Sequence, residues 1–540
     1  MTRTAVLIVS LATLLSRPAW AQHEHDRSAE HLGRVVFPIS CNPAAQQRFS
    51  RALALLHSFW WEQGQAAFQA VADADSTCAM AYWGMALNAW GNPFAGGPGG
   101  NAGKGDPLRR GAAAAERASA LSARTARERG FIAASAALYR GFDSIPNARR
   151  LQAYSDTLAR VYRDFPTDAE VAIYYALSLV ETASKTDTTF ARQKRAAAIL
   201  NPLFQRFPEH PGLAHYIIHA NDSPKLATLG LGAARRYAEI APSAPHAQHM
   251  PSHIFIRLGL WDETIAANQR AFEAGLAYAR AHNEPVAPER LHALDYMVYA
   301  YLQEGRDRAA RSIIDTAQRL VTTGTSDMLL ANYNRVAMEA RLPLERSDWA
   351  AASRLPVRVA ELTIGAALDH FARGIGAARL GDTAQARLEI AALAATEADM
   401  TRRGDAEWAR VVAIKQQAVM AWTELAAGDT VAALRGAKAA ADLEDVTEKQ
   451  PVTPAELLPA RELQADMLLA TGRYAEARAA FETTLTREPG RARSLFGAAR
   501  AAELAGDTAG ARRRYDAYLT QMKSGDGERA EIAQARAALR

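Results

Sequence analysis

Two pairs of histidines are the residues of this sequence whose spacing suggests chemistry. Both pairs occur in segments that read Pro-x-x-x-His-x-x-x-His, and the second segment lies 34 residues after the first: the pairs are His215 with His219 and His249 with His253. Residues four apart lie on one face of an α-helix. Each pair therefore predicts two imidazole rings that point in the same direction from one helix.

Imidazole rings from neighbouring helices can converge on a metal ion, because packed helices lie about 8–10 Å apart. Zinc takes imidazole nitrogens at about 2.0–2.1 Å, and copper, nickel and iron accept the same donors. On this hypothesis the ligands are His215, His219, His249 and His253. Pro251 lies inside the second segment and predicts a kink in its helix.

Two other interpretations of the histidines stay open. They could hydrogen-bond to one another, to Asp295 and to the backbone in a polar groove. They could also line a groove in which His, Arg and Tyr side chains contact the carboxylates of a bound peptide.

Sequence signatures of catalysis are missing from the chain. It holds no H-E-x-x-H, G-x-S-x-G or C-x-x-C motif. Gly103 and Lys104 do not complete a phosphate-binding loop, because Pro98 stands where that motif needs glycine and Gly105 where it needs Ser or Thr. We therefore assign no catalytic residue.

The histidine segments belong to a repeat that runs along much of the chain. Near the C-terminus, Gly472 and Gly506, Ala477 and Ala511, and Phe481 and Tyr515 each lie 34 residues apart. Glycine permits a tight turn between helices, the small residue allows close approach, and the bulky residue fills the gap to the next unit. The same glycine turn recurs at Gly305 and Gly381, and weaker copies occur at Gly259 and Gly428.

This pattern of Gly, Ala, aromatic residue and Pro resembles the tetratricopeptide repeat (TPR), whose period is about 34 residues. The resemblance implies an all-α fold, an α-solenoid of TPR-like antiparallel helix pairs. We expect roughly ten to twelve such pairs.

The TPR resemblance also implies a concave groove lined by fixed positions of each repeat. Placed on those positions and their neighbours, the predicted groove residues are His215, His219, Asp222, His246, His249, His253, Arg257, His292, Asp295 and Tyr299.

The repeats and the composition together predict the organisation of the chain. The predicted parts are a signal peptide (1–21), an N-terminal segment (22–43), an N-terminal TPR-like array (44–305) with a Gly/Pro loop (91–107) and the His-rich groove, a C-terminal TPR array (306–525), and a C-terminal helix or tail (526–540).

The near-balanced charge argues against a dedicated nucleic-acid binder, so we expect no nucleic-acid partner. The chain has 540 residues, with 63 Lys and Arg against 58 Asp and Glu, a net charge of +5. Loss of the predicted signal peptide removes Arg3 and Arg17 and leaves +3. Nucleic-acid binders carry a far larger basic excess.

The N-terminus predicts export. Arg3 precedes an apolar run that is too short to span a bilayer, and Ala19-Trp-Ala21 is typical of a signal-peptidase site. No later segment is apolar for long enough to span, so we expect no transmembrane segment after cleavage. In an oxidising compartment Cys41 and Cys78 predict one disulfide, and two buried free thiols are the alternative.

Several strings are similar to a family of exported bacterial TPR proteins. They include Phe37-Pro-Ile-Ser-Cys41, Cys78-Ala-Met-Ala-Tyr-Trp-Gly84 and Ala214-His-Tyr-Ile-Ile-His219. This resemblance implies periplasmic or secreted localisation and a TPR fold, and it implies no reaction.

Three functional hypotheses follow. The leading one is a non-enzymatic exported scaffold that binds a protein or peptide partner in its groove and needs no cofactor. The alternative is a metal-binding protein or metal-dependent enzyme that holds a transition metal such as zinc at the histidine cluster. A sugar-binding solenoid would use Trp60, Trp61, Trp83 and Trp90, although tryptophans at such positions are more often packing residues.

Overall fold

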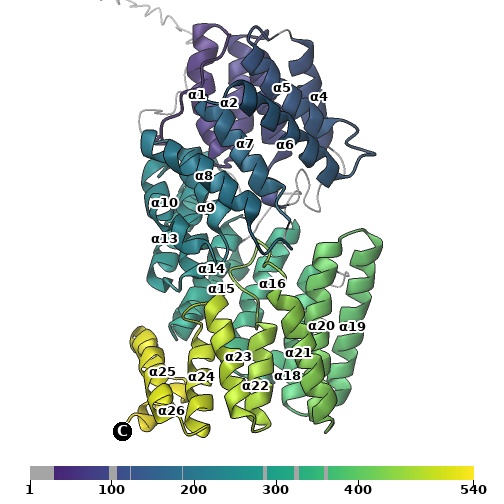
Figure 1. Ribbon diagram of the computed structural model, residues 1–540, viewed down its shortest axis with the longest axis vertical. Helices are drawn as coiled ribbons and strands as arrows, with labels where there is room; N and C mark the ends of the chain where they lie inside the picture. The colour runs from purple at the N-terminus through teal and green to yellow at the C-terminus, as the bar shows by residue number, and fades with distance from the viewer. Residues whose placement is uncertain are drawn as a thin grey trace, which may run out of the picture.

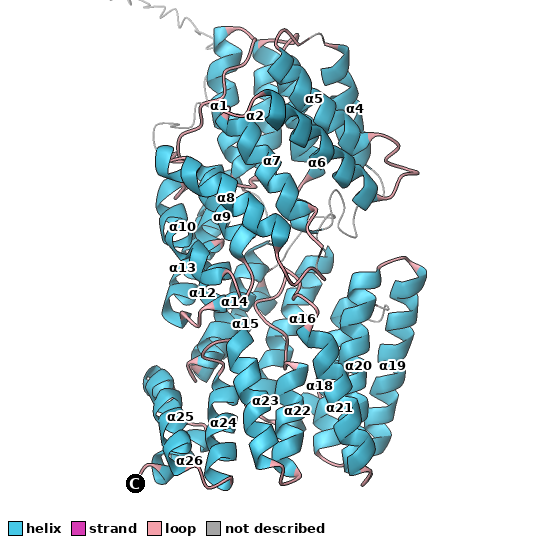
Figure 2. Cartoon of the chain, viewed as in Figure 1, coloured by secondary structure: helices cyan, strands magenta, loops and turns pink. Residues whose placement is uncertain are grey.

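The computed structural model describes residues 30–95, 106–121, 123–184, 186–283, 289–320, 328–357 and 363–540. Within these ranges the chain forms helices joined by turns and loops, without strands, as Figure 2 shows. The predicted all-α class is confirmed. The predicted signal peptide (1–21) and residues 96–105 of the Gly/Pro loop lie outside the described residues.

The helices follow one another along the chain with short connections. Those of the first half are α1 (Pro43–His57), α2 (Trp61–Ala74), α3 (Ala79–Trp90), η2 (Pro93–Ala95), α4 (Asp106–Ala120), α5 (Ala126–Tyr139), α6 (Asn147–Asp164), α7 (Ala169–Glu181), α8 (Ala191–Arg206), α9 (Pro211–Asn221), α10 (Ala227–Ile240), α11 (Pro245–His249), α12 (Pro251–Arg257) and α13 (Trp261–His282). Those of the second half are α14 (Glu289–Gln303), α15 (Asp307–Arg319), α16 (Met328–Glu345), α17 (Trp349–Ser353), α18 (Ile364–Arg379), α19 (Thr383–Arg402), α20 (Ala406–Ala426), α21 (Thr430–Asp445), α22 (Ala460–Ala470), α23 (Tyr474–Arg487), α24 (Ala492–Leu504), α25 (Thr508–Gln521), η4 (Met522–Ser524) and α26 (Ala530–Ala538).

These helices stack as an α-solenoid of antiparallel pairs. Each helix packs mainly on its neighbours in the chain. Figure 1 shows the resulting progression from purple helices at one end, through teal helices in the middle, to green and yellow helices at the other end. One pair cannot bury its apolar stripe alone, so stacking supplies a core that runs along the array.

The predicted repeat positions explain the turns between paired helices. The six turn glycines named from the repeat have φ between 66° and 91°, a left-handed backbone that side chains disfavour: Gly259, Gly305, Gly381, Gly428, Gly472 and Gly506. The small residues that follow them are buried, for example Ala477 at 0% and Ala511 at 5% exposure. The buried apolar residues form several clusters, and one of them runs from Phe272 to Leu342, across the predicted array boundary at 305/306.

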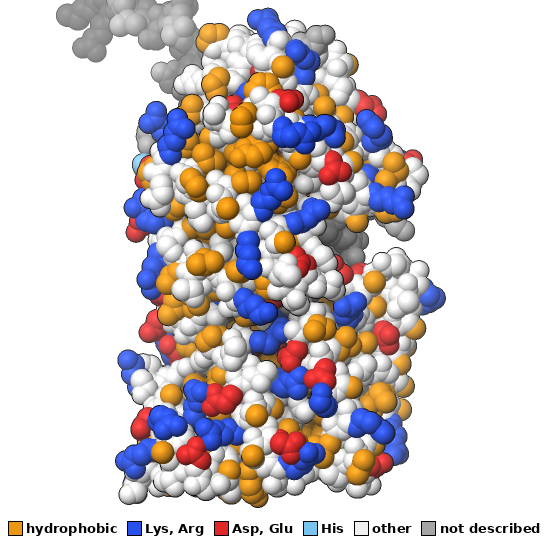
Figure 3. Space-filling view, viewed as in Figure 1, with side chains coloured by type: hydrophobic (Ala, Val, Ile, Leu, Met, Phe, Trp, Pro, Cys, Tyr) orange, Lys and Arg blue, Asp and Glu red, His pale blue; other side chains and the backbone are white. Residues whose placement is uncertain are grey.

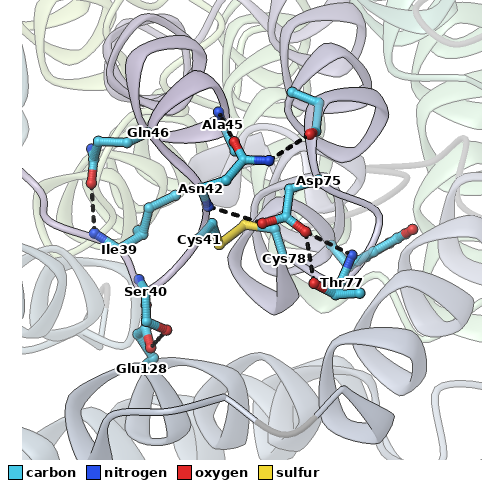
Figure 4. The surroundings of a disulfide bond; sticks show 12 residues. Ile39, Ser40, Cys41, Asn42, Ala45, Gln46, Asp75, Thr77, Cys78 and Glu128 are labelled. Atoms are coloured by element: carbon cyan, nitrogen blue, oxygen red, sulfur yellow. Dashed lines mark hydrogen bonds between the residues drawn. A yellow bond between two sulfur atoms is a disulfide. The ribbon is translucent and has the colours of Figure 1, made fainter.

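The N-terminal segment is tied to the first helices by a disulfide, drawn in Figure 4. Cys41 and Cys78 are bonded, with an S–S distance of 2.06 Å and a sequence separation of 37. The Asn42 side chain caps α1 by accepting a hydrogen bond from the Ala45 backbone N–H, and the Asn42 backbone N–H donates to the Asp75 carboxylate. The disulfide therefore connects the start of α1 to the start of α3.

Removal of this disulfide should lower stability measurably. In the chain-entropy model a closed loop of this length stabilises the fold by about 3–4 kcal/mol. The variant Cys41→Ser/Cys78→Ser should therefore lose about that much unfolding free energy for the α1–α3 region, as read from denaturant melts without reductant. Wild-type protein in reductant should match the variant, whereas a loss below about 1 kcal/mol would contradict the predicted effect.

The end of the chain returns to the middle of the array. The Asp526 amide donates to the Gly305 carbonyl at 2.9 Å, and Arg529 forms a buried ion pair with Asp307 at 2.5 Å. In Figure 1 the yellow helices α24–α26 accordingly lie near the teal helices α14 and α15, which this turn connects. The loop of residues 446–459, between α21 and α22, also packs inward and contacts α14 and α16.

One face of the molecule is drawn with its side chains in Figure 3. On the face drawn in Figure 3, acidic, basic and apolar side chains are mixed, and histidine surface is nearly absent. Among the described helices, none combines the length and the apolar character that crossing a bilayer requires.

Candidate metal centre

Three histidines meet where α9 packs against α11, and we call them the first triad: His215, His219 and His246. The His215 Nε2 atom lies 3.0 Å from His219 Nε2 and 3.2 Å from His246 Nε2. On its other side, His215 Nδ1 lies 2.7 Å from the His57 backbone carbonyl. A carbonyl can only accept, so Nδ1 carries the proton and Nε2 of the neutral ring keeps its lone pair. One lone pair thus faces two other ring nitrogens.

The next repeat forms a matching group, the second triad: His249, His253 and His292. The Nε2 atoms of His249 and His253 lie 3.1 Å apart, almost the spacing found in the first pair. As predicted, Pro251 interrupts the helix, which is divided into α11 and α12. Met250 keeps helical backbone angles across the break, and the Ser252 hydroxyl donates to the His249 carbonyl. The i,i+4 relation of the two rings therefore survives the proline.

Hydrogen bonds on the outer side of the second triad settle where its protons lie. His249 Nδ1 lies 2.6 Å from Asn268 Oδ1, and the Asn268 amide is oriented by donating to the Thr264 carbonyl. His253 Nδ1 lies 2.9 Å from an oxygen of Asp222. Both partners are acceptors, so both Nδ1 atoms carry protons. The two Nε2 lone pairs then face each other at 3.1 Å, a contact that no hydrogen bond between neutral rings can explain.

A second proton, on Nε2 of one ring, would also place a hydrogen between the two nitrogens. Burial opposes this because it disfavours the charged form of the ring. Burial lowers the pKa of His249 to about 3, and the nearby His253 ring adds to the effect. Burial, reinforced by His249, also holds the pKa of His292 well below its usual value, and its Nδ1 finds no hydrogen-bond partner among the described residues. Neutral rings with inward lone pairs are the expected state at neutral pH.

The metal-free protein should lose stability steeply in mild acid. Burial lowers the pKa of all six triad histidines below the ordinary value of 6.5. Below pH 6.5 these histidines bind protons in the unfolded chain but stay neutral in the folded chain. The free energy of unfolding therefore falls by about 1.4 kcal/mol per pH unit for each such histidine. The contribution is fully present above pH 6.5 and declines as the pH falls toward the folded-state pKa.

Denaturant melts of metal-free protein between about pH 7.5 and pH 5 would measure this loss. A His249→Gln/His253→Gln variant should show a shallower dependence, because two of the titrating groups are gone. Unfolding free energies that do not change over this range would contradict the assigned protonation states.

Aromatic rings enclose both triads. The Phe94 ring stacks on His219 with centroids 4.0 Å apart, and Tyr237 stacks on His215 at 5.2 Å. Phe59, whose φ is 51°, lies within 5.5 Å of His246. Tyr296 lies 4.9 Å from both His249 and His292. The left-handed backbone of Phe59 is unfavourable for a bulky residue, and backbone strain of this kind clusters at functional sites.

A third group, His57, Glu170 and His210, differs from the triads because hydrogen bonds join its rings to a carboxylate, although His210 Nδ1 has no partner among the described residues. Both rings donate from Nε2 to the Glu170 carboxylate, His57 at 3.1 Å and His210 at 2.9 Å. His57 Nδ1 then accepts from the Tyr216 hydroxyl at 3.0 Å. Burial would raise the pKa of Glu170, but the two rings outweigh it and hold that pKa far below normal. This group holds α1, α7 and α9 together and so fixes the carbonyl that orients His215.

Not all predicted site residues meet. His215, His219, His249 and His253 do not form one ligand set; they are divided between the triads, because each i,i+4 pair converges on its own side and the next repeat supplies the third ring. Asp222 and Arg257 lie beside the second triad and form an ion pair at 2.9 Å.

Asp295 and Tyr299 do not line an open groove as expected. Their exposures are 0% and 1%, because the second half of the chain covers them. Asp295 pairs with Arg341 of α16 at 2.8 Å, and the Tyr299 hydroxyl donates to Glu488 at 3.2 Å. The predicted contact centre for a partner is therefore largely buried.

Sequence reasoning missed several residues of the site. Asn268, Tyr296 and the His57 carbonyl hold or enclose triad rings, and none of them stands in the histidine pattern. Lys449 of the 446–459 loop also lies close, and burial lowers its pKa to about 8 although Asp222 opposes the shift. The sequence signal for the third ring of each triad is that His246 and His292 each lie just before the groove positions of the next repeat.

The comparisons with known proteins do not identify the chain. No family model matches it, and no curated protein matches it. Among solved structures, yeast Tom70 is 12% identical, with 92% of this chain and 95% of that chain covered and a TM-score of 0.33. The human IFIT1 dimer with PPP-AAAA is 11% identical, with 77% and 86% covered and a TM-score of 0.36. At these TM-scores the likeness carries no argument, and the solenoid rests on the helices of this chain.

Proposed function

We propose that this chain is a transition-metal-binding protein in which each triad holds one ion through inward-facing ring nitrogens. The observation that carries the proposal is the contact between the Nε2 lone pairs of His249 and His253, 3.1 Å apart with both Nδ1 protons committed elsewhere. A cation between the rings converts this repulsion into two bonds.

The dimensions of the triads support an ion. Metal–nitrogen bonds of about 2.0–2.1 Å in tetrahedral geometry separate ligand nitrogens by about 3.4 Å. The Nε2 separations in the structure are 3.0, 3.2 and 3.1 Å, and a small outward shift of the rings would match the metal-bound value. Hydrogen bonds from Nδ1 to a carbonyl, an amide oxygen and a carboxylate are the usual outer support of metal-binding histidines.

The ligand type narrows the metal and the kind of site. Three neutral imidazoles suit zinc, copper, nickel and iron, and they do not suit calcium or magnesium. Three protein ligands leave a coordination position open, which is typical of sites that bind a further ligand and not of closed structural zinc sites. This favours the metal-binding hypothesis over a scaffold whose groove contacts a partner through these histidines. A protein or peptide partner elsewhere on the solenoid stays a prediction.

Metal analysis of untagged protein tests the proposal. After dialysis with excess Zn²⁺ or Cu²⁺ and removal of loose ions, wild-type protein should retain about two equivalents per chain. The control His370→Ala should retain the same amount, because His370 hydrogen-bonds to Glu389 in the second half of the chain. Retention of less than about half an equivalent by wild-type protein would count against the proposal.

The outer hydrogen bond of His249 gives a finer test. Asn268→Leu keeps the volume and removes the acceptor, so His249 loses its orientation and basicity. Loss of such outer partners weakens metal binding by about 10–100-fold. In chelator competition, one equivalent should weaken by this factor and the other should not. Equal affinity in wild type and variant would contradict the assigned role of Asn268.

We also propose that the chain is exported to the bacterial periplasm or secreted. The bonded Cys41–Cys78 pair supports an oxidising compartment, and the sequence before it supports signal cleavage. N-terminal sequencing of protein from the periplasm or medium should start at Gln22. Uncleaved protein confined to the cytoplasm would overturn this proposal.

A further inference from the structure

The two triads lie side by side, and we call their six rings the double-triad site. Ring centroids of His219 and His253 are 6.4 Å apart, and those of His246 and His249 are 6.1 Å apart. Within the second triad, His253 and His292 are 6.0 Å apart. Most rings of one triad are closer, at 4.6–5.0 Å, so the two triads are adjacent but separate groups.

The double-triad site has an uncompensated positive charge once metal is bound. All six ligands are neutral imidazoles, so two divalent ions would add four positive charges to a buried site. The carboxylate nearest to a triad nitrogen, Asp222, is already paired with Arg257, and Lys449 adds a positive charge nearby. Buried charge without a counter-charge is unfavourable by several kcal/mol per ion, so this site favours an anion.

Aromatic rings lie around the double-triad site. Phe59 and Phe94 contact His219, and Tyr296 contacts His249 and His253. These rings supply apolar surface around the ligands, and a surrounding of low dielectric constant strengthens the attraction of an anion for the ions.

Resting on the metal binding proposed above, we infer that both ions occupy a single dinuclear centre and share one small bridging anion, of the size of hydroxide or azide. Each triad leaves a coordination position open, and the short distance between the triads lets one ligand reach both ions. In known two-metal sites the ions lie about 3.5–4 Å apart.

Copper(II) is a suitable probe because its unpaired electron reports on a neighbouring copper. Protein loaded with two equivalents of Cu²⁺ should show magnetic coupling, with less than about half of the copper detected as isolated spins by electron paramagnetic resonance. The reference is His249→Ala/His253→Ala loaded with one equivalent, in which the remaining ion should give its full isolated signal. Circular dichroism checks that this variant is folded.

Azide then tests the shared ligand. It should bind to the two-copper protein at least about tenfold more tightly than to the one-copper variant, because one anion contacts two ions.

Three other results would overturn the inference: two tightly bound ions with full isolated signals, one ion per wild-type chain, or equal azide affinity in both proteins. A wild-type chain that binds no copper would instead overturn the proposed function, so the two failures are distinguishable.

Discussion

A chain with both His249 and His253 replaced by alanine should retain about half of the metal that wild-type protein binds. The second triad would be left with His292, and one imidazole does not hold an ion against a chelator. The first triad keeps its three rings and the hydrogen bond from His215 to the His57 carbonyl. His215→Ala/His219→Ala is the mirror variant and should lose the other equivalent.

The same variants should differ in how far metal stabilises the fold. An ion present at about 1,000 times its dissociation constant adds about 4 kcal/mol per site to the unfolding free energy. Wild-type protein should gain about twice as much as either double variant, and His370→Ala should behave as wild type. If metal raises the unfolding free energy of both double variants as much as that of wild-type protein, the binding sites lie outside the triads.

The second large effect is expected at the ion pair between Asp295 and Arg341, both of which are 0% exposed. Arg341 also donates to the Thr453 hydroxyl and the Ala455 carbonyl, and so anchors the 446–459 loop against α14. Arg341→Met leaves the Asp295 charge buried without its partner. Removal of one member of a buried pair is unfavourable by about 3–5 kcal/mol, and the variant should lose about that much stability.

Two controls separate this effect from ordinary charge removal. Arg236→Met breaks an exposed pair with Glu209 and should change stability by less than about 1 kcal/mol. Asp295→Leu/Arg341→Met leaves no unpaired charge at this position and should recover part of the loss. Hydrogen exchange should show the 446–459 loop opening more often in Arg341→Met. A stability loss no larger than that of Arg236→Met would show that the pair does not hold the loop.

The fold could be predicted from the sequence because its rules are local. Gly472 and Gly506 permit the turns, Ala477 and Ala511 permit close helix packing, and each repeat contacts mainly its neighbours. The break at Pro251 followed from the same local reasoning.

The candidate site could be predicted only in part, because its geometry depends on contacts distant in sequence. The i,i+4 pairs follow from one helix, but the assignment of His246 to the pair before it depends on how α11 sits against α9. Burial of Asp295 and Tyr299 depends on residues more than 40 positions later in the chain, such as Arg341. No repeat pattern encodes where the array turns back on itself.

Anomalous X-ray scattering from crystals soaked in Zn²⁺ or Cu²⁺ tests the central claim most directly. Our proposal predicts two strong anomalous peaks, one in each triad, each about 2.0–2.1 Å from three ring nitrogens. Peaks confined to surface residues, or triads without anomalous density at full metal loading, would contradict it.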